Sequence, residues 1–265
     1  MAHELHLTRH GAATQERRTP EQLAALEKLP SEEFKQEIFA MNMRQGLVER
    51  GQLEIADLGR RIGNVLLPDA ATIVALVGPY RRHQESAEIA LSVPELADRT
   101  IHVIHDNRLA ERSRGRLDAS IWPARKLRDL SPEHPYGDQF AEKEQHPATW
   151  RPPEGENYAD VNARIDVALE DHGLTNSPHP VVVFGSGEMA LARLNLSDEE
   201  YRRGTLTESG RHMSLLALNN AGIVSLSDPH DVGNFTHWQV HDPVEIPRED
   251  SYHEPQVIHS QLNQY

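Results

Sequence analysis

The sequence predicts an α/β fold, a three-layer sandwich around a mainly parallel central sheet, and we expect residues 1–265 to form a single domain. Two wholly apolar runs, at residues 73–77 and 181–184, have the length and composition of strands buried on both faces. Strand-like and helix-like segments alternate for most of the chain, which is typical of helices packed on both sides of a parallel sheet. A chain of 265 residues is long enough to bury such a core.

The first predicted strand spans residues 4–11, where apolar and polar side chains alternate before a glycine. Residues 12–50 are polar and rich in charge, with helices expected at 20–29 and 31–43, each opened by a proline or a serine. This segment is too short to bury a core alone. We therefore expect a helical excursion from the main domain.

A stronger helical signal begins at Gly51. Apolar side chains recur there at the spacing of one helix face, namely Ile55, Leu58, Ile62, Val65 and Leu66. The first buried strand, residues 73–77, ends at Gly78, and a helix of about ten residues is expected from Tyr80. Residues 101–104 form a further short strand.

The second half of the chain begins with residues 113–156, which are rich in proline and predict an ordered loop or lid. The next helix is expected to bury one face made of Tyr158, Val161, Ile165 and Leu169. Residues 181–184 form the second buried strand and lead into another helix. Residues 213–218 and 223–226 predict a hairpin, and residues 236–240 an edge strand.

The composition excludes several classes of protein. Asp and Glu number 41 against 27 Lys and Arg, a formal charge of −14, so we expect no nucleic-acid partner. Without cysteine the chain has no disulfide, thiolate nucleophile or zinc–thiolate site. No apolar run approaches the roughly eighteen residues of a membrane span, and a strand beginning at Glu4 leaves no room for a signal peptide. We therefore expect a cytoplasmic protein with no membrane partner.

Three predicted strand ends carry unusual residues, which are Arg9-His10-Gly11, Gly78 followed by Arg81 and Arg82, and Gly185-Ser186-Gly187. Ligands of open parallel sheets bind where the carboxyl ends of strands lead into turns and helix N-termini. Arginine presents a planar fork that matches phosphate or carboxylate, and histidine suits nucleophilic or proton-transfer chemistry near neutral pH. These strand ends therefore predict a site for a small anion.

Six segments carry a resemblance to a known family, in the order 7–11, 51–59, 78–87, 107–112, 155–161 and 181–194. They are similar to motifs of the histidine phosphatase superfamily, the fold of the cofactor-dependent phosphoglycerate mutases and many acid phosphatases. The resemblance spans roughly residues 4 to 225. It implies that His10 becomes phosphorylated, that Arg9 and Arg82 hold the phosphoryl oxygens, and that Glu111 donates the proton to the leaving group.

Four positions depart from the family pattern, which are Ala13, Glu16, Gly78 and Ser186. The family places hydroxyl or amide side chains at the first three and its second histidine at residue 186. Ser186 is expected to act at the catalytic centre through one neutral hydrogen bond, which is weaker than a charge-assisted one. Since several positions differ together, Ser186 is not an isolated change, and the resemblance implies a weakened site.

Two more residues complete the expected phosphate-binding set. Gly187 opens the helix after the strand at residues 181–184. Arg112 belongs to a basic cluster with Arg108, Arg114 and Arg116. This cluster is either a solvated loop or a patch that draws an anionic substrate toward Glu111.

The leading hypothesis is an enzyme that hydrolyses a phosphate ester of a small anionic metabolite, with no metal and no cofactor. One alternative uses His10, Glu111 and the arginines for acid–base chemistry on a non-phosphorylated substrate such as a carboxylate. Another is a binding or regulatory protein whose active site has decayed. The identity of the substrate stays open, and a homo-oligomer is compatible with the sequence.

Overall fold

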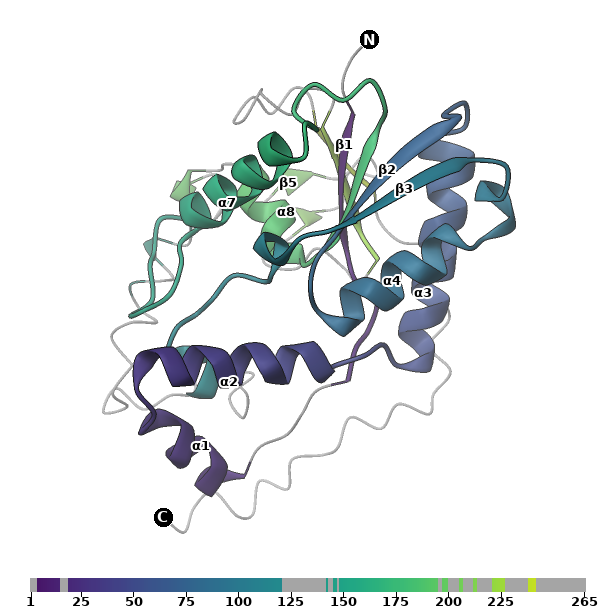
Figure 1. Ribbon diagram of the computed structural model, residues 1–265. Helices are drawn as coiled ribbons and strands as arrows, with labels where there is room; N and C mark the ends of the chain where they lie inside the picture. The colour runs from purple at the N-terminus through teal and green to yellow at the C-terminus, as the bar shows by residue number, and fades with distance from the viewer. Residues whose placement is uncertain are drawn as a thin grey trace.

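The computed structural model describes residues 4–14, 19–120, 142, 145–146, 148–194, 197–199, 205–206, 212–213, 221–226 and 238–241. Within them, six strands form one sheet in the order β3-β2-β4-β1-β7-β8 (Figure 1). These strands are β1 (Leu5–Arg9), β2 (Thr72–Val77), β3 (Thr100–His105), β4 (Val181–Gly185), β7 (Ile223–Leu226) and β8 (Trp238–His241). Strands β1 to β4 are mutually parallel, whereas β7 and β8 are antiparallel to their neighbours. The predicted α/β sandwich with a mainly parallel sheet is confirmed.

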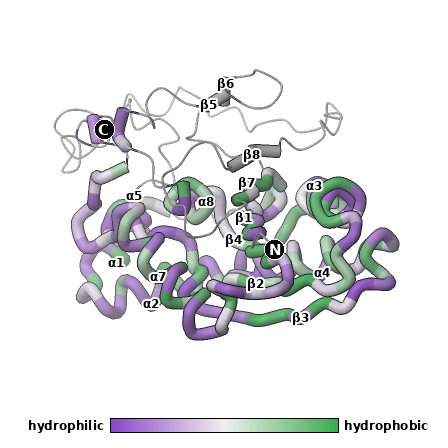
Figure 2. Tube along the Cα trace, turned by 90° about the horizontal axis from the view of Figure 1, so that it is seen from above, coloured by the Kyte–Doolittle hydropathy of each residue, from purple (hydrophilic) through white to green (hydrophobic). Residues whose placement is uncertain are grey.

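Helices cover both faces of this sheet. Helices α3 (Glu49–Arg61) and α4 (Arg81–Leu91) lie on one side, and α7 (Tyr158–Asp171) and α8 (Gly187–Arg193) on the other. Seen from above, β1, β2 and β4 lie between α7 and the pair α3 and α4 (Figure 2). Short helical turns complete the described chain, namely η1 (Ile62–Leu66), η2 (Pro94–Leu96), η3 (Asn107–Leu109) and α5 (Leu117–Ser120).

The apolar runs of β2 and β4 produce two cores because successive side chains of a strand point to opposite faces. Ile73, Ala75 and Val77 pack with α3 and α4. Val74 and Leu76 pack with α7 and α8, where the predicted helix face from Tyr158 to Leu169 is buried. Both faces of these strands are therefore dry, which explains why their sequences do not alternate.

Helices α1 (Pro20–Glu27) and α2 (Ser31–Arg44) form the predicted excursion. They lie beyond the carboxyl ends of the strands (Figure 1) and bury a small cluster of their own, made of Leu26, Phe34, Ile38 and Met41. The guanidinium of Arg116 lies over the Phe34 ring, 4.8 Å from its centroid, and this contact connects the excursion to the segment that follows Glu111.

Two sequence-based expectations are wrong. Val65 is 66% exposed, because the helix widens at η1, where Leu67 N bonds to Ile62 O five residues back and the apolar face is turned away. The hairpin between residues 213–218 and 223–226 is also not formed as expected. Both edges of β7 are occupied, by β1 and by β8, so the predicted edge strand takes that place.

Residue Met213 instead belongs to β6 (His212–Met213), which pairs with β5 (Thr205–Leu206) in a separate sheet. Residues 214–220 lie outside the described residues. Across the ranges that are described, no helix has both the length and the apolar composition needed to span a membrane.

Candidate active site

The turn after β1 places His10 by packing closely against the first turn of α3. A Cβ at Gly11 would lie 2.3 Å from Gly51 O, and one at Gly51 would lie 2.0 Å from Ala12 O, so both positions require glycine. Ala12 N also donates to Glu54 Oε2 at 2.8 Å. The glycine that begins the α3 motif therefore serves the approach of backbone to backbone at the site.

His10 is held in one tautomer. Its Nδ1 lies 2.7 Å from Gly11 O, and because a carbonyl oxygen only accepts, Nδ1 carries the hydrogen. The Nε2 lone pair accepts from Arg82 Nε at 3.2 Å. Burial, reinforced by the charge of Arg82, lowers the pKa of His10 to about 3. At neutral pH the ring is therefore uncharged, with its nucleophilic nitrogen directed at a guanidinium.

Arg82 connects the predicted catalytic residues. It lies in the first turn of α4, where its N–H donates to Gln45 O, and its side chain is almost completely buried. Nη2 binds Glu111 Oε2 at 2.7 Å, and Nη1 donates to Asn42 Oδ1 at 3.3 Å. The structure thus brings His10, Arg82 and Glu111 into direct contact, from three segments far apart in the chain.

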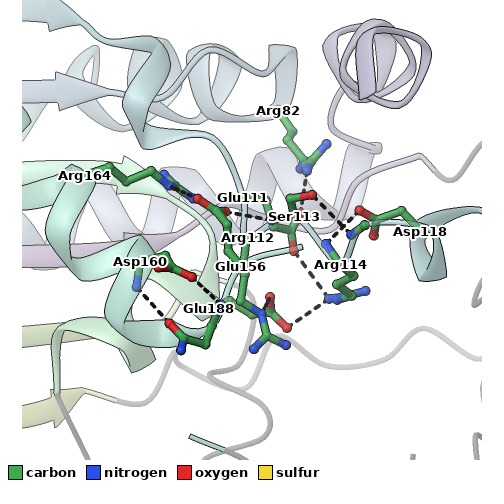
Figure 3. A network of polar contacts seen from close by, with 12 residues as sticks. Arg82, Glu111, Arg112, Ser113, Arg114, Asp118, Glu156, Asp160, Arg164 and Glu188 are labelled. Carbon is green, nitrogen blue, oxygen red and sulfur yellow. Dashed lines mark hydrogen bonds and ion pairs between the residues drawn. The ribbon is translucent and has the colours of Figure 1, made fainter. Parts of the chain in front are cut away.

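Glu111 follows η3 and faces two arginines (Figure 3). Its Oε1 lies 3.9 Å from Arg114 Nη2, in addition to the contact with Arg82. Burial favours the neutral acid, but the charges of Arg82 and Arg114 outweigh it and hold the pKa of Glu111 below its ordinary value. Without a ligand, Glu111 is therefore a carboxylate.

Glu188, in the first turn of α8, connects Arg112 and Arg114 (Figure 3). Arg112 Nε donates to Glu188 Oε2 at 3.1 Å, and Arg114 Nη2 donates to Glu188 Oε1 at 3.0 Å. The Arg112 side chain is fully buried, with its guanidinium 4.6 Å from the Tyr158 ring centroid. These contacts attach the segment that carries Glu111 to the first turn of α8. Phosphate binding by Arg112 stays a prediction.

The expected basic patch is wrong as a source of free positive charge. All four arginines of the cluster have acidic partners: Asp106 and Asp171 for Arg108, Glu188 for Arg112, Glu188 and Glu111 for Arg114, and Glu154 for Arg116. Asp106 and Glu111 belong to the same segment as the arginines, whereas Asp171, Glu188 and Glu154 come from other parts of the chain, which the run of arginines alone does not indicate. The cluster is a set of ion pairs rather than a solvated loop or an attracting surface.

Arg9 ends β1, is partly buried and lies close enough to Glu111, Glu54 and Arg82 for their charges to act on it. Ser186 caps α8, whose first residue is Gly187, and is buried with an Oγ that has no hydrogen-bond partner among the described residues. His10 N donates to Gly185 O, so the residues around position 186 adjoin the nucleophile.

The other departures have different outcomes. Ala13 pairs with Leu47 in an isolated bridge and packs against the apolar cluster of α3 and α4, which leaves no role for a polar side chain there. Residue 78 has no space for a side chain, because a Cβ there would lie 2.3 Å from His83 Nδ1 and 2.7 Å from the backbone oxygen of Leu109. Glu16 lies outside the described residues.

The predicted lid is tied together at its two ends. Ser113 N donates to Glu156 Oε2 at 2.9 Å, and Glu156 N donates to Ser113 O at 2.8 Å. Both ends are thus fixed beside Glu111. Residues 121–141, 143–144 and 147 lie outside the described residues, so the prediction that this segment forms the rim stays a prediction.

Sequence reasoning missed four residues of the site, which are Asn42, Glu54, His83 and Glu188. Asn42 comes from the excursion and Glu54 from the glycine-led helix, whose start at Gly51 was the available signal. In the described part of the chain, no group of three or more His, Cys, Asp or Glu side chains is arranged to hold a metal ion.

Residues 5–203 match the family model of the histidine phosphatase superfamily (branch 1). No curated protein sequence shows a significant match. The chain is similar in fold to mycobacterial glucosyl-3-phosphoglycerate phosphatase Rv2419c, with 19% identity, a TM-score of 0.53 and coverage of 91% of this chain and 98% of that one.

The Mycobacterium tuberculosis open reading frame product Rv3214 is similar to the same extent, with 19% identity, a TM-score of 0.51 and coverage of 92% and 97%. At such identities the likeness shows the fold alone. The family model, however, covers most of the chain. This protein belongs to the histidine phosphatase superfamily.

Proposed function

We propose that this protein is a phosphatase that hydrolyses a phosphate ester of a small anionic metabolite through a phosphohistidine at His10. The state of His10 carries the proposal, since Nδ1 is bound to Gly11 O at 2.7 Å and the Nε2 lone pair lies 3.2 Å from Arg82 Nε. A neutral imidazole beside a guanidinium is suited to attack a phosphoryl group that the guanidinium binds.

In the first half-reaction, His10 Nε2 forms a bond to phosphorus while the bond from phosphorus to the ester oxygen breaks. Arg9 and Arg82 bind the non-bridging oxygens, and protonated Glu111 gives its proton to the departing alcohol oxygen. In the second, water attacks phosphorus, the phosphorus–nitrogen bond breaks, and the Glu111 carboxylate takes a proton from the water. Inorganic phosphate leaves, and His10 is neutral again.

Substrate binding causes Glu111 to take up from solvent the proton that it later donates. In the absence of a ligand, Arg82 holds Glu111 as a carboxylate at 2.7 Å. A bound phosphate competes for the same guanidinium and places negative charge beside Glu111, and both effects raise the pKa of the carboxyl group. Glu111 is therefore protonated, and able to act as the acid, only when an anionic substrate is bound.

The ion pairs around the site favour a compact substrate. Arg112 and Arg114 are already engaged by Glu188, and the whole chain carries a formal charge of −14. An extended polyanion would meet repulsion beyond the first phosphoryl group. A small ester with one phosphoryl group at Arg9 and Arg82 meets the least.

Turnover of an aryl phosphate by the wild type, His10→Ala and His102→Ala tests the proposal. His102 is exposed on the edge strand β3 and provides a matched histidine control. We expect His10→Ala to lose turnover by at least about 10³-fold and His102→Ala to retain it. Rapid quenching of the wild type should trap an acid-labile phosphohistidine at position 10.

Wild-type protein with neither turnover nor trapped phosphohistidine would overturn the proposal. Binding of inorganic phosphate without turnover would instead identify a binding or regulatory protein. Turnover of a carboxylate substrate that depends on His10 would identify repurposed acid–base chemistry.

A further inference from the structure

The site contains a histidine that the proposed reaction does not use. His83 lies in the first turn of α4, its side chain is fully buried, and neither ring nitrogen has a hydrogen-bond partner among the described residues. Its ring centroid lies 5.6 Å from that of His10 and 5.2 Å from that of Tyr80. Leaving both nitrogens of a buried imidazole unpaired is costly, and a ligand that accepts from one of them would recover part of that cost.

Gly78 provides the space for this ring. A Cβ at residue 78 would lie 2.3 Å from His83 Nδ1, 2.7 Å from the backbone oxygen of Leu109 and 3.2 Å from His83 Cε1. The hydroxyl group that the family pattern places there is incompatible with the observed position of His83 and with the Leu109 backbone. The absence of a side chain at Gly78 therefore admits both the imidazole and the close approach of Leu109.

The position of the ring in the sheet is equally informative. Strand β4 lies between β2 and β1. At the ends of these strands, Gly78 N donates to Phe184 O and His10 N donates to Gly185 O. A ring that approaches Gly78 after β2 and His10 after β1 therefore lies across the end of β4, where residue 186 begins the turn into α8.

Ser186 leaves this space open. The family pattern places an imidazole at residue 186, whereas the serine presents only a buried hydroxyl group, which has no hydrogen-bond partner within the described ranges. The end of β4 thus has a small residue where the family pattern has a large one.

We infer that His83 is a catalytic residue that supplies the second imidazole of the site and donates a hydrogen bond to the transferring phosphoryl group. Gly78 admits the ring, and Ser186 leaves free the space that the ring uses. Two of the four departures from the family pattern are then parts of one relocation of a side chain. This inference rests on the proposed phosphatase function.

Substitutions at residues 83 and 186 test the relocation. His83→Leu keeps most of the volume and removes both nitrogens, and we expect kcat for an aryl phosphate to fall about 10²-fold, because one transition-state donor is lost. His83→Asn keeps a donor and should lose less. The same change at an exposed position, His102→Leu, is the matched control and should leave kcat unchanged.

Ser186→His alone should give no gain, since His83 already occupies the site. In a His83→Ala background it should restore kcat by at least about tenfold over His83→Ala. An enzyme with His83→Leu that stays within about twofold of the wild type would refute the inference. So would a double variant that is no faster than His83→Ala.

A readout without turnover separates failure of this inference from failure of the proposed function. Inorganic phosphate is titrated into wild-type protein labelled with ¹⁵N-histidine, with the residue 83 signals assigned by their loss in His83→Asn. We expect those ring nitrogen signals to shift, and His83→Leu to bind phosphate at least about tenfold more weakly by calorimetry.

Such responses in a protein without phosphatase activity would refute the phosphatase and keep His83 as an anion ligand. Turnover in the wild type together with unchanged residue 83 signals would refute the inference alone. Because the titration uses the wild type, it decides the matter even where a variant does not fold.

Discussion

Two arginines follow neighbouring strands, Arg82 after β2 and Arg108 after β3, and their partners differ. Arg108 is saturated, since Nε and Nη2 donate to Asp106 at 3.0 and 2.6 Å and Nη1 binds Asp171. Arg82 divides its nitrogens among three partners, which are His10, Asn42 and Glu111. The guanidinium of Arg108 is fully engaged by two carboxylates. That of Arg82 instead contacts three different groups, each of which can also bind a ligand.

One carboxylate from each region, Asp106 beside Arg108 and Asp118 beside Arg114, has its pKa shifted in the opposite direction to the other. Hydrogen bonds from Arg108 lower the pKa of Asp106 to about 2, so its charged form stabilises the fold. Burial raises the pKa of Asp118, whose Oδ2 accepts from Arg114 N, to about 6, so its charged form is costly. The comparison teaches that the charge of Asp106 contributes stability, whereas the charge of Asp118 beside the site is held at a cost in stability.

The largest expected effect separates the two arginines. Arg82→Met should lower aryl phosphate turnover about 10³-fold, because it removes a charged donor and releases Glu111. Arg108→Met should leave turnover unchanged and lower the free energy of unfolding only slightly, because ion pairs near the surface are screened by solvent. Kinetics and urea unfolding of both variants check this. Equal losses of turnover in Arg82→Met and Arg108→Met would show that the two clusters do not differ in function.

Glu111→Gln should have the next largest effect, and it should depend on the leaving group. An alkyl phosphate needs protonation of the departing oxygen, so its kcat should fall about 10²-fold or more, whereas nitrophenyl phosphate should lose far less. The ratio of the two losses is the measurement. A loss of the same size for both substrates would contradict the role of Glu111 as proton donor.

The smallest effects concern stability against pH. The folded-state pKa of Asp118 lies above the ordinary value of 3.8 for an aspartate, so its stabilising contribution is present below pH 4 and lost as the pH rises through about 6. Asp118→Asn should therefore raise the free energy of unfolding at pH 7.5, on the order of 1–3 kcal/mol, and do little at pH 4.

Asp106→Asn is the counterpart in the first cluster. The folded-state pKa of Asp106, about 2, lies below the ordinary value of 3.8 for an aspartate, so the stability it contributes is present above pH 4 and lost as the pH falls toward 2. The variant should be less stable than the wild type at neutral pH, by about 1–2 kcal/mol, with the difference vanishing near pH 2. Urea unfolding from pH 2.5 to 7.5 compares both variants, and a shift of the same sign at pH 7.5 would break the comparison.

The sequence by itself predicted the layers of the fold and part of the site. Continuous apolar runs predict the buried strands. Residues shortly after the carboxyl ends of parallel strands, such as His10 and Arg82, are expected at one edge of the sheet. Those signals depend on a few consecutive residues. They do not report the ionisation of a side chain or the space around it.

Tertiary structure decided the rest. In the sequence, the arginines after residue 107 indicate a patch of unpaired positive charge. In the structure, carboxylates from α7, α8 and other segments form ion pairs with them. In the sequence, Gly78 indicates only the loss of a hydroxyl group, whereas in the structure the His83 ring lies where a side chain of residue 78 would be. The low pKa of His10 depends on burial that no local pattern encodes and on the charge of Arg82, 72 positions further along the chain. Local composition selects the elements, whereas charge state and steric room arise only from contacts between residues distant in the chain.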